Sequence, residues 1–130
     1  MMVDTTFLLD LARGDPGARA ALEAMERDSE ALRVPAPALA KLWEGVERAR
    51  TRPRETTALR ELLLGVPSAP FEAKHAMLAA RLLADAAGAA TPLDPFDAMV
   101  AAMAVSEDET LLTRNTRELG GVAELRMRTY

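Results

Sequence analysis

The stretch Thr91–Asn115, TPLDPFDAMVAAMAVSEDETLLTRN, is the one around which the rest of the chain is organised. It places two carboxylates, Asp94 and Asp97, at the start of an apolar helix. A strand-like segment, 109–113, follows the helix and leads into a polar ending, TRN at 113–115. If Asp4 folds back beside this stretch, the protein has an acidic pocket that is suited to a metal ion.

The composition of the chain predicts one soluble domain spanning residues 1–130. A chain of 130 residues with 49% apolar residues is long enough for one hydrophobic core and too short for two substantial ones. The absence of cysteine excludes disulfides and thiolate metal sites. The sequence shows neither a basic-then-apolar leader nor a run near the roughly 18 apolar residues of a membrane span. We therefore expect a cytoplasmic protein with no membrane partner.

The charge of the chain is acidic overall but unevenly distributed. A net charge of −4 argues against a general nucleic-acid coat, because such proteins usually carry a basic excess. Fourteen of the 16 basic residues are arginine, and four of them lie within seven positions, at Arg48, Arg50, Arg52 and Arg54. The guanidinium group binds phosphate well, so this cluster is either a local basic rim or a solvated helix end and loop.

Short apolar segments alternate with helical patterns along the chain, which predicts an α/β fold with a mainly parallel sheet. Strands are expected at 1–3, 32–34, around Val66, at 109–113 and at 125–128, and helices after Asp4, from Pro16 to about Glu30, from Pro37, and at 55–64, 71–87 and 95 onward. Sites in such sheets form beyond the carboxyl ends of the strands. Asp4 and Asn115 both fall at that end of a predicted strand.

The acidic sequence Asp94-Pro95-Phe96-Asp97 has two interpretations. Asp94 is a good N-cap and Asp97 a favourable residue of the first helical turn, so helix capping alone explains both. Alternatively, carboxylates gathered at a site repel one another unless a cation neutralises them, and oxygen ligands favour Mg²⁺ or Mn²⁺. Such an ion activates water for in-line attack on phosphate, which is nuclease chemistry.

Three short motifs together resemble the PIN-domain family, and within it the VapC toxins of VapBC toxin–antitoxin pairs. They are VDTT at 3–6, FDAMVAA at 96–102, and LTRN at 112–115 followed by REL at 117–119. The resemblance implies a single α/β domain whose central sheet of four or five mainly parallel strands has the order 3-2-1-4-5 and is flanked by helices. It also implies a cytoplasmic endoribonuclease that depends on Mg²⁺ or Mn²⁺, frequent homodimers, and a cognate VapB-like antitoxin whose peptide occupies the acidic groove.

The same resemblance assigns roles to individual residues. Asp4 and Asp97 are expected to be the metal ligands and catalytic carboxylates. Asn115 takes the last polar catalytic position, where many relatives carry aspartate, and Glu118 adds acidity from one turn further on. The residues expected to contact the substrate are Thr6, which would also orient Asp4 or a water molecule, Thr113 and Arg114.

One position departs from the family pattern. The family usually has glutamate where the sequence KLWEG places Lys41. Glu44 lies one turn later on the same helix face, so it either reaches the site as the substitute catalytic carboxylate or forms a surface pair with Lys41. A lysine in the pocket repels a metal ion, so the alternative function is a PIN-fold protein that binds RNA or a partner with weak or no catalysis.

Overall fold

The computed structural model describes all of residues 1–130 and contains one row of five short parallel strands. The strands are β1 (Met2–Val3), β2 (Val34–Pro35), β3 (Ser68–Ala69), β4 (Leu111–Leu112) and β5 (Met127–Arg128). β4 lies between β1 and β5, β2 pairs with β3, and a parallel bridge between Met2 and Arg33 joins the two sets. The predicted strand order, 3-2-1-4-5, is confirmed.

Seven helices surround these strands, and three of them begin at aspartate caps. The helices are α1 (Thr5–Arg13), α2 (Pro16–Arg27), α3 (Ala36–Glu47), α4 (Arg52–Leu62), α5 (Ala73–Ala86), α6 (Pro95–Ser106) and α7 (Thr116–Leu119). The side chains of Asp4, Asp15 and Asp94 each accept a hydrogen bond from a backbone N–H in the first turn of α1, α2 and α6. The predicted starts of these helices are therefore correct. None of the helices has the length and apolar character that a bilayer crossing requires.

The sequence predictions differ from the structure at α4, at the third strand and at α7, and several other element ends shift by one to three residues. α4 begins at Arg52 instead of residue 55, because Pro53 sits in the first helical turn, where a missing N–H costs nothing. The third strand lies at Ser68–Ala69 rather than at Val66. α7 was not predicted, since its four residues are too few to show helical periodicity.

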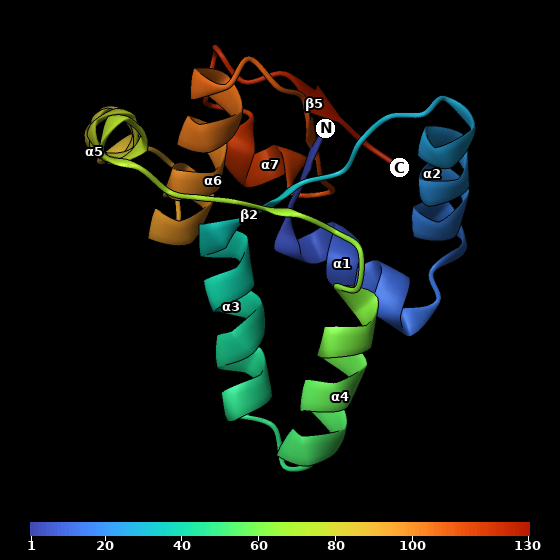
Figure 1. The fold of residues 1–130 in the computed structure, drawn as a ribbon. Coiled ribbons are helices and arrows are strands. Elements are labelled where there is room, and N and C mark those ends of the chain that lie inside the picture. Colours follow the sequence, from blue (N-terminus) through green and yellow to red (C-terminus); the bar gives the residue numbers. More distant parts are fainter.

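The helices are arranged unevenly around the strands. In Figure 1, α5 and α6 lie on one side of the strands and α2 on the other. α3 and α4 run together away from the strands and form a hairpin, residues 36–62, whose tip is the lowest point of the view. The amino end of α3 lies near the strands and its carboxyl end lies at the tip, so this helix connects the centre of the molecule with its periphery.

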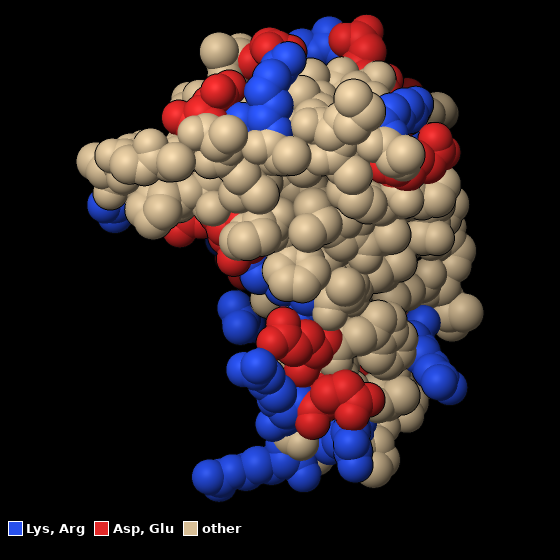
Figure 2. All heavy atoms as spheres, turned by 90° about the vertical axis from the view of Figure 1, so that its left-hand side faces the viewer, with Lys and Arg blue, Asp and Glu red and all other residues tan.

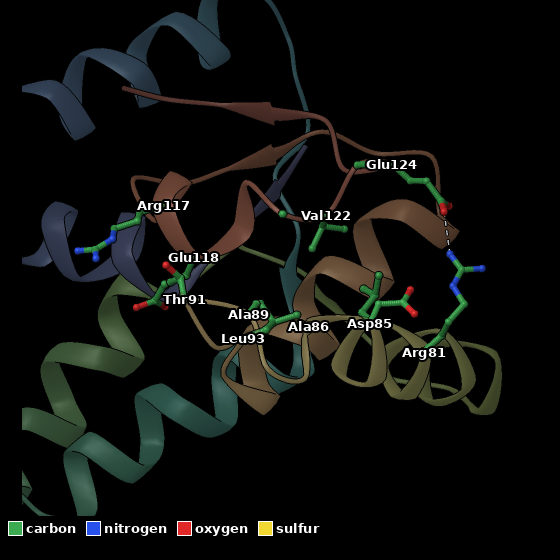
Figure 3. Close-up of a pocket in the computed structure, with 13 residues that line it drawn as sticks. Arg81, Asp85, Ala86, Ala89, Thr91, Leu93, Arg117, Glu118, Val122 and Glu124 are labelled. Atoms are coloured by element: carbon green, nitrogen blue, oxygen red, sulfur yellow. Dashed lines mark hydrogen bonds and ion pairs between the residues drawn. The ribbon is translucent and has the colours of Figure 1, made fainter.

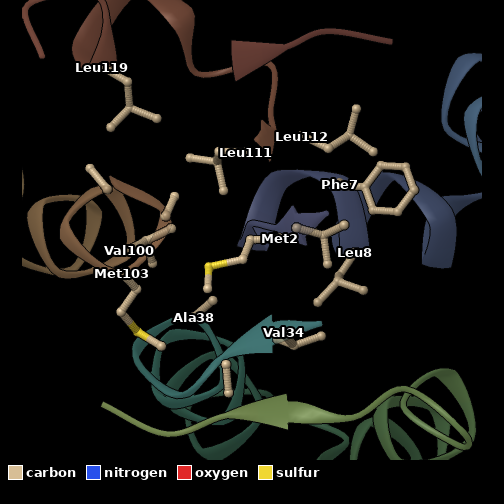
Figure 4. Packing of buried hydrophobic residues seen from close by; sticks show 14 of the residues in the cluster. Met2, Phe7, Leu8, Val34, Ala38, Val100, Met103, Leu111, Leu112 and Leu119 are labelled. Atoms are coloured by element: carbon tan, nitrogen blue, oxygen red, sulfur yellow. The ribbon is translucent and has the colours of Figure 1, made fainter. Parts of the chain in front are cut away.

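The core fills the space between the central strands, α1 and α6. Met2, Leu111 and Leu112 of β1 and β4 are fully buried, and Figure 4 shows them between Phe7 of α1 and Met103 of α6. α6 is buried on most of its circumference, at Ala98, Val100, Ala101, Ala102, Met103 and Ala104. Since these side chains are mostly small, neighbouring elements approach α6 closely and fix the position of its amino end.

We predict that Leu111→Ala lowers the free energy of unfolding by about 2–5 kcal/mol, because it opens a cavity at the central strand pair. Leu64→Ala is the matched control. Leu64 is 77% exposed, so the same truncation there changes the free energy of unfolding by about 0.5 kcal/mol or less. Urea denaturation of the two variants measures both values, and equal losses in the two would contradict the assigned core.

Candidate functional site

Asp4 is held at the carboxyl end of β1 by the residue that follows β4. Val3 pairs with Leu112 in parallel register, so Asp4 and Thr113 leave the sheet side by side. The Thr113 hydroxyl donates a hydrogen bond to Oδ2 of Asp4. Oδ1 accepts from the Thr6 hydroxyl at 2.6 Å and from the backbone N–H of Phe7 at 3.0 Å. The carboxylate of Asp4 is thus buried, oriented and supplied with donors on both oxygens.

Asp97, in the first turn of α6, is connected to Asp4 through Asn115. The Asn115 side-chain amide donates to Oδ2 of Asp97 at 3.0 Å. The Asn115 backbone N–H donates to the Thr113 hydroxyl at 2.9 Å, and that hydroxyl contacts Asp4. A continuous chain of hydrogen bonds therefore links the two carboxylates, which are 93 residues apart in sequence.

Lys41 enters this site from α3 and lies between two carboxylates. Its Nζ is 3.4 Å from Oδ1 of Asp97 and 3.6 Å from Oδ1 of Asp94. Burial favours the neutral amine, but the negative charges of Asp97 and Asp94 outweigh burial and raise the pKa of Lys41. The ammonium group is therefore positively charged at neutral pH and occupies the position between the two acids.

The ion pair with Lys41 does not bring the pKa of Asp97 below its ordinary value. Burial raises the pKa of Asp97 above the ordinary 3.8, Lys41 lowers it in part, and the nearby charges of Asp94 and Glu118 raise it again. The two directions differ because Asp97 is the more enclosed partner, with 17% of its side chain exposed against 38% for Lys41. The site thus carries an excess of negative charge that Lys41 does not fully neutralise.

Glu118 extends the acidic cluster toward a neighbouring pocket. Oε2 of Glu118 accepts from the Asn115 amide at 3.0 Å, so one amide bridges Asp97 and Glu118. Figure 3 shows Glu118 beside Thr91 at the edge of a pocket of about 410 Å³, with the ion pair between Arg81 and Glu124 at its other end. Neither Asp4 nor Asp97 lines this pocket, so it adjoins the site and does not contain it.

Glu44 does not join the other site residues. Its carboxylate pairs with Arg48 at 2.8 Å on the exposed part of α3, while Lys41 turns toward α6. The interpretation in which Glu44 pairs with Lys41 is therefore wrong, since Lys41 pairs with Asp97 and Asp94 instead. The structure also places Glu44 in no contact with the carboxylates of the site.

Thr6, Thr113 and Arg114 were predicted to contact the substrate, and the structure gives each of them a partner within the protein. The hydroxyls of Thr6 and Thr113 both donate to Asp4. The Arg114 guanidinium pairs with Asp10 at 3.1 Å and Asp15 at 2.9 Å, and it lies 4.4 Å from the ring centroid of Tyr130. Their roles toward substrate remain predictions. The Tyr130 hydroxyl also donates to Oδ2 of Asp10 at 2.9 Å, a contact that no spacing in the sequence indicates.

The donor set of the site suits a hard divalent ion. Asp4 and Asp97 supply carboxylate oxygens only, and Mg²⁺ commonly binds through one or two carboxylates while keeping several water molecules. No group of three or more His, Asp or Glu side chains lies close enough to hold a metal ion by itself. The residues therefore fit Mg²⁺ or Mn²⁺ with water as the remaining ligands, provided that Lys41 gives up its contact with Asp97.

The sequence of residues 1–125 matches the family model of the PIN domain. The chain belongs to the PIN-domain family. The resemblance that three short motifs indicated is therefore confirmed over nearly the whole length. No curated protein sequence matches the chain.

Solved structures of low sequence identity share the fold of this PIN domain. The structure of VapBC2 from Rickettsia felis bound to a promoter DNA fragment is 19% identical, with a TM-score of 0.88, over 99% of this chain and 97% of the other. The DNA-bound VapBC from Salmonella typhimurium is 21% identical, with a TM-score of 0.84, over 98% and 96%. VapBC-1 from nontypeable Haemophilus influenzae is 19% identical, with a TM-score of 0.80, over 98% and 96%.

The opposing influences on Asp97 yield a prediction about pH. We expect a carboxyl titration followed by ¹³C NMR to give Asp97 a pKa above 3.8, and Lys41→Met to raise it further, because the lowering effect of the ammonium is lost. A raised folded-state pKa means that Asp97 favours folding when protonated. Stability from this group is therefore lost as pH rises through that pKa, and in Lys41→Met the loss extends to higher pH.

Lys74→Met is the matched control for this titration. Lys74 pairs with Glu107 on another part of the surface, so its removal leaves the pKa of Asp97 unchanged. An equal shift of the Asp97 pKa in the two variants, or none in Lys41→Met, contradicts the ion pair assigned here.

Proposed function

We propose that this PIN domain is a metal-dependent endoribonuclease and the toxin of a type II toxin–antitoxin pair. The observation that carries the proposal is the hydrogen-bonded chain from Asp4 through Thr113 and Asn115 to Asp97. It joins two carboxylates beside β1 and β4, the neighbouring strands between which the strand order reverses. Open α/β sheets form their sites at such a point. PIN domains are generally nucleases, and membership in the family supports the same class of reaction.

Asp4 and Asp97 would hold Mg²⁺ or Mn²⁺, as PIN-domain nucleases generally use divalent metals. When bound, such an ion supplies an activated water and stabilises negative charge on the phosphate. Hydrolysis adds water across a P–O bond of the RNA backbone and leaves one phosphate end and one hydroxyl end. Thr6, Thr113 and the Phe7 N–H keep Asp4 oriented for this role.

Asn115 positions the second carboxylate and its acidic neighbour. Its amide donates to Asp97 and Glu118 at 3.0 Å each, so one side chain just after β4 holds both carboxylates. An amide at this position donates hydrogen bonds, whereas an ionised aspartate accepts them. In this protein Asn115 therefore organises the carboxylates and adds no negative charge of its own.

The partners of this toxin would be RNA, a cognate VapB-like antitoxin and a second copy of the chain in a cytoplasmic homodimer. The support for the antitoxin is the likeness in fold to chains of VapBC structures from three bacteria. Lys41 and the exposed part of Asp94 would meet an antitoxin peptide that enters the acidic groove.

Cleavage of single-stranded RNA in the presence of Mg²⁺ or Mn²⁺ tests the proposal. We expect Asp4→Asn and Asp97→Asn each to reduce the rate by about 100-fold or more, because each removes a charge that acts on the reacting phosphate. Asp108→Asn is the control, since Asp108 has 92% of its side chain exposed and lies outside the site. Cleavage that persists undiminished in both site variants, or that no RNA and metal combination elicits, contradicts the proposal.

A second candidate function is binding of RNA or a partner without turnover. The ion pair between Lys41 and Asp97 favours it, because the ammonium already occupies an oxygen that a metal ion needs. This function keeps the PIN fold and the groove but not the reaction.

Lys41→Glu distinguishes the two functions. If the ammonium blocks the metal, this variant binds Mn²⁺ roughly tenfold more tightly or better by isothermal titration calorimetry, and it gains cleavage. Lys41→Met separates the loss of the positive charge from the gain of a carboxylate ligand. Methionine fills similar space but carries neither the ammonium nor a carboxylate. Wild-type protein whose Mn²⁺ affinity and cleavage equal those of Lys41→Glu rules out the second function.

A further inference from the structure

We propose that the tip of the α3–α4 hairpin, defined as the exposed arginines Arg48, Arg50, Arg52 and Arg54, holds the phosphate backbone of the RNA beside the cleavage position. This inference rests on the proposed function, because it names where that substrate gains its affinity. The four arginines lie at the C-cap of α3, in the connecting loop and in the first turn of α4. No acidic residue interrupts them between 48 and 54.

The hairpin is the positive part of an acidic chain. Residues 36–62 contain six basic and four acidic side chains, whereas the net charge of the chain is −4. Figure 2 shows Lys and Arg side chains gathered at the lower end of the face, where the hairpin projects, with Asp and Glu side chains among them and a largely uncharged area above. A projecting segment that carries several like charges attracts a polyanion over a distance of about 10 Å at moderate salt.

Arg50 and Arg54 are free to bind a ligand. Neither forms an ion pair or a side-chain hydrogen bond, and both are exposed. Arg48 and Arg52 each pair with a glutamate at 2.8 Å, Glu44 and Glu47. Because exposed ion pairs contribute little stability, a phosphate competes readily for these two guanidinium groups as well.

The tip is continuous with the candidate site along one face of α3. Lys41 contacts Asp97 inside the site, and Arg48 lies seven residues later, almost two full turns along the same helix face. At 1.5 Å per residue this separation is about 10 Å, so an extended RNA strand that leaves the site along α3 reaches the tip within a few nucleotides.

The charge of the site itself explains why an RNA substrate needs such a contact. The site gathers four carboxylates, those of Asp4, Asp94, Asp97 and Glu118, against the single ammonium of Lys41, so the centre repels the phosphate backbone instead of attracting it. Arginine offers a planar fork of donors that matches phosphate, and contacts to the backbone supply most of the sequence-independent affinity of proteins for nucleic acids. The tip therefore fits an RNA strand better than a peptide, whose few carboxylates do not repeat at every unit.

Fluorescence anisotropy with labelled single-stranded RNA, in EDTA so that no cleavage occurs, tests the proposal on the intact protein. We expect the double variant Arg50→Ala/Arg54→Ala to bind RNA roughly tenfold more weakly at about 0.1 M salt. The slope of log K against log salt should fall in magnitude by about 1.4, since each lost contact to a single strand contributes about 0.7. Arg50→Lys/Arg54→Lys keeps the charges and should retain the slope.

Arg19→Ala/Arg27→Ala is the matched control. It removes two exposed, unpaired arginines from α2 and changes the net charge equally. Equal losses of affinity in the two alanine double variants, or no loss in either, overturn the proposal. Loss of binding to an acidic peptide such as polyglutamate with RNA binding unchanged also overturns it and assigns the tip to a protein partner.

Cleavage assays separate this proposal from the proposed function. With Mg²⁺ or Mn²⁺, we expect Arg50→Ala/Arg54→Ala to cleave a dinucleotide as fast as wild type and a longer RNA with a raised KM. A protein that cleaves no RNA contradicts the nuclease, while the anisotropy result still decides whether the tip binds the strand. A lowered rate on the dinucleotide overturns the tip proposal, because so short a substrate does not reach the hairpin.

Discussion

The parallel pairing of β1 with β4 is the constraint on which the site depends. Each strand has only two residues, yet their register places Asp4 opposite Thr113 at the carboxyl edge of the sheet. An unpaired carboxylate at this depth is costly, and the Thr113 hydroxyl, the Thr6 hydroxyl and one backbone N–H remove that cost. The same pairing presents Asn115 to α6. One contact between strands therefore positions both Asp4 and Asp97, the two ends of the hydrogen-bonded chain.

The lysine at the centre of the site shows how the protein balances the charges that this pairing gathers. Asp97 is largely enclosed and its neighbours Asp94 and Glu118 are acidic, so its pKa is raised and an adjacent cation favours its ionised form. In most family members a metal ion is expected to serve this purpose, and here Lys41 already approaches to 3.4 Å. The Lys41 ammonium sits on a flexible stem, so a metal ion that binds at this site would compete with it for one oxygen of Asp97.

The sequence was informative where a physical signal is local and failed where contacts are long-range. The caps at Asp4, Asp15 and Asp94 were predicted because a short polar side chain before a helix has few other uses, and the strand order followed from the family resemblance. The direction of Lys41 was not predicted. Periodicity places Lys41 and Glu44 on one face of α3, but only the packing of α3 against α6 decides that Lys41 meets Asp97. The pairing of Arg114 with Asp15, 99 residues earlier, likewise has no local signal.

In the function proposed here, the chemical part of the protein is separate from the part that attracts the substrate. Carboxylates that hold a metal ion repel RNA, and a site that attracted RNA by itself would lose the acidity on which metal binding depends. Placing arginines on a hairpin tip about 10 Å along α3 resolves this conflict, since that distance equals a Debye length at moderate salt. In this proposal the tip charges act on the incoming strand without neutralising Asp97. Arg48 follows directly on the last residue of α3, so the rigidity of that helix fixes its spacing from Lys41, while Arg50 and Arg54 continue the tip into the connecting loop and α4.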